Sequence, residues 1–83
     1  MSIRINKAEQ LGAVIKAVRK AQGLRQDDAA GSIGVSENFL GKVENGNPSV
    51  SWRKLFEVLD GLGIRVVLDL PVAIDTSKLG SEQ

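Results

Sequence analysis

The sequence predicts a mainly α-helical domain of four to five helices, followed by one short β-strand and a flexible tail. Apolar residues recur at helical spacing through most of residues 6–63, and glycines or turn sequences separate the periodic segments. The spacing changes to period two over residues 64–70, and residues 71–83 show neither pattern. We therefore divide the chain into a helical domain (6–63), a strand (64–70) and a tail (71–83).

The first predicted helix covers residues 7–22, with Asn6 as its N-cap and Gly23 as the residue that ends it. Its apolar face consists of Leu11, Val14, Ile15 and Val18. Residues 1–25 hold six basic side chains and one acidic side chain, Glu9. This asymmetry suits an anionic partner, although a solvated helix face would explain it equally well.

Two short helices are predicted next, at residues 26–33 and 37–44. Asp27 and Asp28 suit the positive end of the first dipole, and Gly34 closes that helix. Ser36 is a good N-cap for the second, with Leu40 and Val43 facing inward.

A fourth helix is predicted at residues 52–62, because residues 45–48 form a strong turn signal and Ser51 can act as its N-cap. Its buried face is predicted to consist of Leu55, Phe56, Leu59 and Leu62, with Trp52 packing at its start.

The predicted strand places the side chains of Ile64, Val66, Leu68 and Leu70 on one face, and Pro71 ends it. A lone strand leaves its backbone polar groups unpaired, so it needs a partner. We favour the same strand of a second subunit, paired antiparallel in a homodimer. An intramolecular pair with residues 2–5 is the alternative.

The composition excludes several classes of protein. The 83 residues include no cysteine and no histidine, which excludes a disulfide scaffold, a zinc finger and histidine acid–base chemistry. The sequence also lacks a glycine-rich phosphate loop and a clustered carboxylate pair, so we expect no enzyme, no cofactor and no metal. No apolar run approaches the roughly 20 residues of a membrane span. The N-terminus lacks the apolar core of a signal peptide, and we expect a cytoplasmic protein without a membrane partner.

The two short helices at 26–33 and 37–44 indicate a DNA-binding unit. A tight turn at Gly34 joins them, and the small Ala30 lets them cross closely. The start of the second helix carries short polar side chains. Such a helix fits the major groove of double-stranded DNA with its first residues at the base edges.

The same segment resembles a known family. Gln26, Ala30, Gly34-Val35-Ser36, Leu40 and Val43-Glu44-Asn45-Gly46 resemble the Xre, or lambda-repressor-like, helix-turn-helix, and the likeness covers about residues 10–62. The β-branched residues after the fourth helix and the polar tail resemble the HipB antitoxins in particular.

The resemblance implies specific roles. Residues that would face bases or flanking phosphates are Ser36, Glu37, Asn38 and Lys42. Contacts to the sugar-phosphate chain would come from Gln26, Arg25 and the turn at Asn45 and Gly46. Arg19 and Glu44 match a structural ion pair between the first and third helices.

The sequence also departs from the family pattern. Ala29 replaces a larger aliphatic residue, leaving a gap that Phe39 or Trp52 would fill. Gly31 and Gly41 each weaken a helix. Glu37 places an acid on the DNA side, where it could accept from a cytosine amino group or simply stabilise the helix start.

Three functions are consistent with these patterns. The first is an autoregulating repressor that is also the antitoxin of a HipA-like serine/threonine kinase. The second is a stand-alone repressor of the phage or restriction-controller kind. The third is a protein-interaction module that no longer binds DNA, suggested by the acids Asp27, Asp28 and Glu37.

Overall fold

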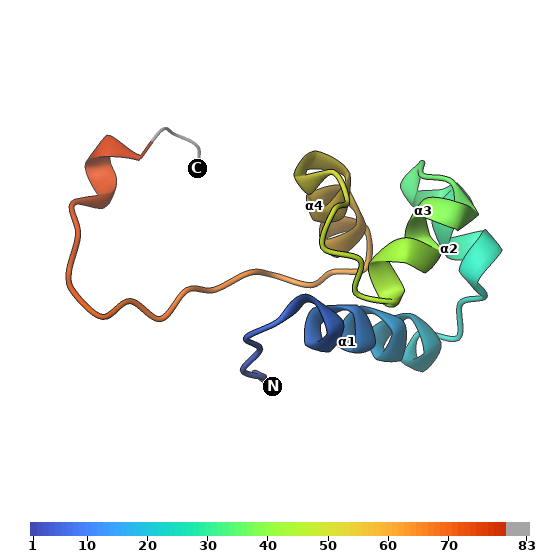
Figure 1. Cartoon of the computed structure of the whole chain (residues 1–83), viewed down its shortest axis with the longest axis horizontal. Coiled ribbons are helices and arrows are strands. Elements are labelled where there is room, and N and C mark those ends of the chain that lie inside the picture. Colours follow the sequence, from blue (N-terminus) through green and yellow to red (C-terminus); the bar gives the residue numbers. More distant parts are fainter. Residues whose placement is uncertain (80–83) are drawn as a thin grey trace.

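The computed structural model describes residues 1–79 and contains four α-helices (Figure 1). They are α1 (Ala8–Ala21), α2 (Gln26–Ile33), α3 (Glu37–Glu44) and α4 (Trp52–Gly61), and a 3₁₀ turn follows at Thr76–Lys78. The helices form one body, in which α3 packs against α1 and α2, and α4 packs against α2. Within the described range, none of the helices is long and apolar enough to cross a membrane. The prediction of a mainly α-helical fold is confirmed.

The helix ends follow the local sequence closely, with one exception. The Ser36 Oγ accepts a hydrogen bond from the Phe39 N–H at 2.9 Å, and the Ser51 Oγ accepts one from the Lys54 N–H at 3.3 Å. Both predicted serine caps are therefore confirmed. The prediction for Asn6 is wrong, because Lys7 occupies the N-cap of α1 and its side chain makes no capping bond. The Asn6 N–H instead donates to the Gln10 Oε1 at 2.7 Å.

The turn between α2 and α3 depends on Gly34, whose φ of 96° lies in the left-handed region. Two amides close the turn on one carbonyl: the Gly34 and Val35 N–H groups donate to the Ala30 oxygen at 2.9 and 3.0 Å. This geometry leaves only Val35 and Ser36 between Gly34 and the start of α3. The relative orientation of α2 and α3 is therefore fixed by a few backbone bonds.

The core draws on all four helices and consists of Ile15, Ala29, Ala30, Leu40, Val43, Val58, Leu59 and Leu62. Trp52 does not fill the predicted gap at Ala29, because it is 76% exposed, whereas Phe39 packs partly buried against the core. The prediction that Phe56 is buried is also wrong. Val58 occupies the core in its place, and Phe56 lies on the outer face of α4, with its ring centroid 6.3 Å from that of Trp52.

A glycine contact joins α1 to the C-terminal end of α3. A Cβ atom on Gly12 would lie 2.5 Å from the Val43 carbonyl oxygen, and one on Gly46 would lie 2.5 Å from the Glu9 Cα. Neither residue can carry a side chain without moving a backbone. The C-terminal end of α3 is therefore held directly against α1.

Residues after α4 form an extended arm rather than the predicted strand (Figure 1). Gly63 has a φ of 76°, and the Ile64 N–H donates to the Leu59 oxygen at 2.9 Å, which ends α4 and packs Ile64 against the core. Within the described residues of the single chain, 64–70 are not a strand and no segment pairs with them, so the favoured pairing with a second subunit stays a prediction. Residues 2–5 do not pair with residues 64–70 either.

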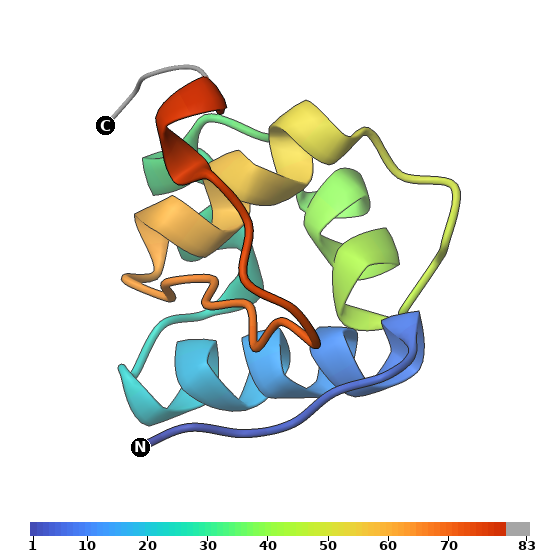
Figure 2. The ribbon, with the colours of Figure 1, turned by 90° about the vertical axis from the view of Figure 1, so that its left-hand side faces the viewer.

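The arm ends in the 3₁₀ turn at Thr76–Lys78, where the Asp75 Oδ1 accepts from the Ser77 N–H at 3.0 Å. The predicted flexible tail (71–83) therefore includes a capped turn, and its last four residues lie outside the described range. Figure 2 views the helices from the side on which the arm projects. Most apolar side chains of the arm are exposed, and Val67 reaches 87%.

Candidate nucleic-acid interface

The beginning of α2 and one side of α3, from its first turn to its C-cap, form an open depression of about 410 Å³ on the surface of the helical body. Its lining consists of Gln26, Glu37, Asn38, Gly41, Lys42 and Asn45. Apart from Gly41, all are residues that the sequence placed at the DNA face. The structure thus gathers base-facing and phosphate-facing candidates from two helices into one recess.

The first turn of α3 presents polar side chains to solvent. Glu37, Asn38 and Lys42 are all exposed, and the first two belong to the opening turn. Ser36 is exposed as well, but its oxygen already accepts the capping bond from Phe39. Its hydroxyl hydrogen remains available to a phosphate or base oxygen. The helix can therefore offer both donors and acceptors to a groove.

Arg25 lies at the N-cap of α2 and outside this recess. Its Nη2 is 3.0 Å from the Asp27 Oδ2, and both side chains are largely exposed. An exposed pair of this kind contributes about 0–1 kcal/mol. A DNA phosphate would therefore compete with Asp27 for the Arg25 guanidinium at little cost.

The turn after α3 binds its own backbone amides. The Asn45 and Gly46 N–H groups donate to the Gly41 and Val43 oxygens at 3.0 Å each, so both amides are satisfied within the chain. Gly46 is moreover buried against α1. Asn45 is exposed, so its side chain is the polar group that this turn presents to solvent.

Arg19 of α1 and Glu44 of α3 form a buried, bidentate ion pair. The Arg19 Nε lies 2.6 Å from the Glu44 Oε2, and its Nη2 lies 3.0 Å from the Oε1. The Arg19 Nη1 also donates to the Leu24 oxygen at 2.9 Å. The hydrogen bond to Glu44 raises the pKa of the Arg19 guanidinium, outweighing the opposing effect of burial. The pair ties α1, the α1–α2 connection and the end of α3 together.

Glu44 holds a second partner that the sequence did not reveal. The Gln26 Nε2 donates to the Glu44 Oε1 at 3.1 Å, so this carboxylate oxygen receives bonds from both Arg19 and Gln26. Sequence reasoning gave Gln26 and Glu44 separate roles. The two residues are 18 positions apart on different helices, and no local pattern indicates that they meet.

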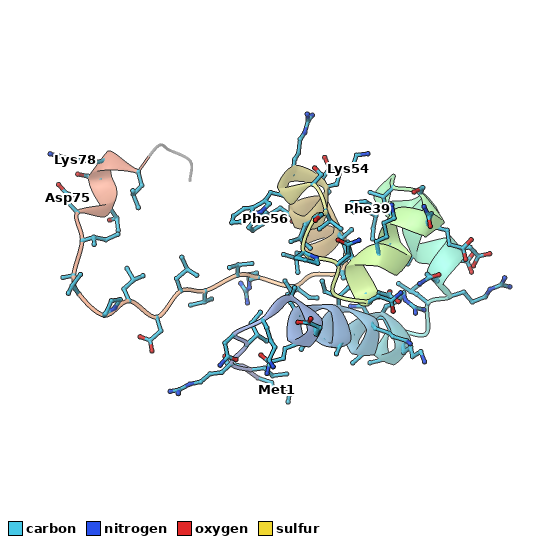
Figure 3. All side chains as sticks on the ribbon, in the orientation of Figure 1. Met1, Phe39, Lys54, Phe56, Asp75 and Lys78 are labelled. Atoms are coloured by element: carbon cyan, nitrogen blue, oxygen red, sulfur yellow. The ribbon has the colours of Figure 1, made fainter. Side chains whose placement is uncertain are left out.

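Lys54 also lies next to α3, although the sequence analysis did not place it there. Its ammonium is 5.7 Å from the centre of the Phe39 ring. Figure 3 shows Lys54 and Phe56 leaving different sides of α4, with Lys54 directed toward Phe39. An exposed cation over an aromatic ring contributes about 0.5–1 kcal/mol, so the contact helps to hold α4 against α3.

The chain is similar to known helix-turn-helix proteins. Residues 10–68 match the model of a helix-turn-helix domain family. The chain is 38% identical over 71 residues to an uncharacterised helix-turn-helix transcriptional regulator of Sinorhizobium fredii, across 86% of this chain and 93% of the relative.

Two solved structures show the same fold. HipB in a HipA–HipB–O2–O3 complex is 24% identical with a TM-score of 0.77, over 86% of this chain and 100% of that chain. The restriction-modification controller protein C.AhdI of Aeromonas hydrophila is 28% identical with a TM-score of 0.62, over 70% of this chain and 88% of that one.

Proposed function

Because the chain belongs to the helix-turn-helix family of DNA-binding transcriptional regulators, we propose that it is a sequence-specific repressor that binds its operator as a homodimer. The observation that carries this proposal is the recess between α2 and α3. This recess brings the Gln26 amide together with Asn38, in the first turn of α3, and Lys42, in its last turn. Phosphate contacts position such a protein, and base contacts select the sequence.

Two substitutions within α3 separate these tasks. Lys42→Ala should weaken binding to all duplexes alike and reduce the salt slope by about one unit. Asn38→Ala should instead cost about 1–3 kcal/mol at one or two base positions per half-site. The measurement is fluorescence anisotropy, over a range of salt concentrations, with duplexes that the wild-type protein selects from a random pool. An unchanged base preference in Asn38→Ala would reject its role as a base reader.

The homodimer is proposed to form through the arm. Val66, Leu68 and Leu70 are exposed on the single chain, although such side chains are stabilised by burial. Pairing of residues 64–70 across a two-fold axis would satisfy their backbone groups and cover their apolar face. Replacing Val66 and Leu68 with Glu should yield monomers that bind DNA weakly. A wild-type chain that sediments as a monomer at micromolar concentration would refute this.

For the biological role we propose an antitoxin that represses its own operon and binds a HipA-like kinase. Support comes from the arm beyond α4 and from the fold shared with HipB, which was solved in a complex with HipA. If a HipA-like kinase is encoded beside this gene, the test is a titration of that kinase into a preformed protein–DNA complex. A further-retarded species supports separate surfaces for DNA and kinase. Stoichiometric release of DNA would show that the surfaces overlap.

A stand-alone repressor is the second candidate function. It is favoured by the likeness to the restriction-modification controller C.AhdI and by 34% identity, over 61 residues, to a 10 kDa protein of the ImmF control region of Bacillus phage phi105. A repressor of this kind needs no toxin. Purification of the tagged protein with no stoichiometric partner, and a gene neighbourhood without a kinase, would favour it over the antitoxin.

A further inference from the structure

We infer that Glu44 is a positioning residue for DNA binding, because it orients the side-chain amide of Gln26. This inference rests on the proposed function, in which Gln26 donates to a phosphate. The Gln26 Nε2 donates one hydrogen to the Glu44 Oε1 at 3.1 Å. A primary amide carries two such hydrogens, so the second remains for a phosphate oxygen.

The orientation of the amide follows from that bond. The Gln26 amide nitrogen donates to Glu44. If the amide rotated by half a turn, its carbonyl oxygen would face the Glu44 carboxylate oxygen, and two acceptors repel each other. A phosphate needs a donor, so a freely rotating amide would offer the wrong atom part of the time. Because Glu44 already holds the amide in the donating orientation, the free energy of orienting it is not lost when DNA binds.

Glu44 is itself fixed, so it can serve as a rigid reference. Its side chain is 3% exposed and is gripped by the Nε and Nη2 of Arg19, which is also bound to the Leu24 carbonyl. Gly41 lies beside the amide, since an added Cβ would be in van der Waals contact with the Gln26 Nε2 at 3.7 Å, and both residues line the open recess. Arg19, Glu44 and Gln26 thus form a chain of bonds from the core to the recess.

The test is a double-mutant cycle between Glu44→Asp and Gln26→Ala. Glu44→Asp keeps the charge for Arg19 but withdraws the carboxylate by one methylene from Gln26. The affinity for a duplex selected by the wild-type protein is measured by fluorescence anisotropy, and stability by urea denaturation. We expect Glu44→Asp to lower affinity about tenfold in the wild-type background and to have no further effect in Gln26→Ala.

Stability is measured as a contrast to affinity. If Glu44→Asp disturbs the ion pair with Arg19, the loss of stability should be the same in the wild-type and the Gln26→Ala backgrounds. Glu37→Asp is the matched control: it shortens a glutamate that lines the recess but makes no bond to Gln26, so its effect should add to that of Gln26→Ala. If both single variants weaken binding and the double variant loses the sum, Glu44 does not act through Gln26 and the inference fails. If Gln26→Ala binds as tightly as wild type, the proposed phosphate contact fails instead, and the inference with it.

Discussion

The Gly12→Ala variant should unfold at a lower denaturant concentration than the wild-type protein, although glycine is a poor helix former and alanine is the best one. Gly12 lies inside α1, where alanine is preferred by about 1 kcal/mol. An alanine Cβ at this position would however lie 2.5, 2.7 and 2.8 Å from the Val43 oxygen, the Glu44 oxygen and the Gly46 nitrogen. All three are backbone atoms, so no side chain can rotate away to relieve the contact.

The magnitude follows from these opposing effects. Overpacking of a core costs about 1–3 kcal/mol, and three backbone contacts below 3.0 Å place Gly12 at or above the upper end. After the gain in helix propensity, we expect a net loss of about 2 kcal/mol in the free energy of unfolding. For a domain of this size, that loss corresponds to a fall in Tm of about 8–16 °C. Thermal and urea denaturation followed by far-UV circular dichroism measure it.

Gly31→Ala is the control, since it makes the same chemical change inside another helix. Gly31 is exposed in α2, and nothing lies within 4 Å of the position that its Cβ would occupy. This variant should be more stable than wild type by about 0.5–1 kcal/mol. Opposite signs for the two variants support the close α1–α3 contact. A Gly12→Ala protein as stable as Gly31→Ala would show that α1 and α3 do not approach as the structure places them.

Two further predictions concern charged groups. Arg19→Ala should destabilise the fold by about 3–5 kcal/mol, because it leaves the buried Glu44 carboxylate without its cation. Arg25→Ala removes an exposed ion pair and should change stability by less than about 1 kcal/mol. Urea denaturation compares the two variants, and equal losses would contradict the burial of the Arg19–Glu44 pair. Hydrogen bonds from the Ser77 side chain and backbone lower the pKa of Asp75, so the 3₁₀ turn is favoured while this carboxylate is charged and should open as the pH falls through the lowered pKa. The Ser77 amide resonance should follow this change, and a resonance that stays constant in acid would show that Asp75 does not hold the turn.

The parts of the fold that the sequence predicted well depend on interactions between near neighbours. Gly34 ends α2 and Ser36 caps α3 through bonds that span three or four residues, so the ends of both helices could be read directly. The errors arise where the deciding interaction is distant. Phe56 and Val58 are both apolar but lie two residues apart in α4, so they point to different sides of the helix, and packing against the other helices decides that the side of Val58 is buried.

The arm and the site show the same limit. β-branched residues at 64–70 favour extended backbone, but a strand needs a partner that the single chain does not supply. The residues of the recess were found through their resemblance to a family motif. The bond between Gln26 and Glu44, which links the recess to the core, carries no such signal. It depends on how α2 and α3 cross, which only the structure gives.

The polar recess and most of the exposed apolar side chains lie on different parts of the surface. The recess is lined by polar side chains and one glycine, whereas exposed apolar side chains gather on the outer face of α4 and along the arm. Trp52 is 76% exposed and Val67 is 87% exposed, although each gains free energy when water is removed from it. The arm leaves the body at the end of α4, away from α2 (Figure 1). A second subunit or a toxin that covers the arm and α4 would therefore bury this apolar surface and leave the recess between α2 and α3 open to DNA.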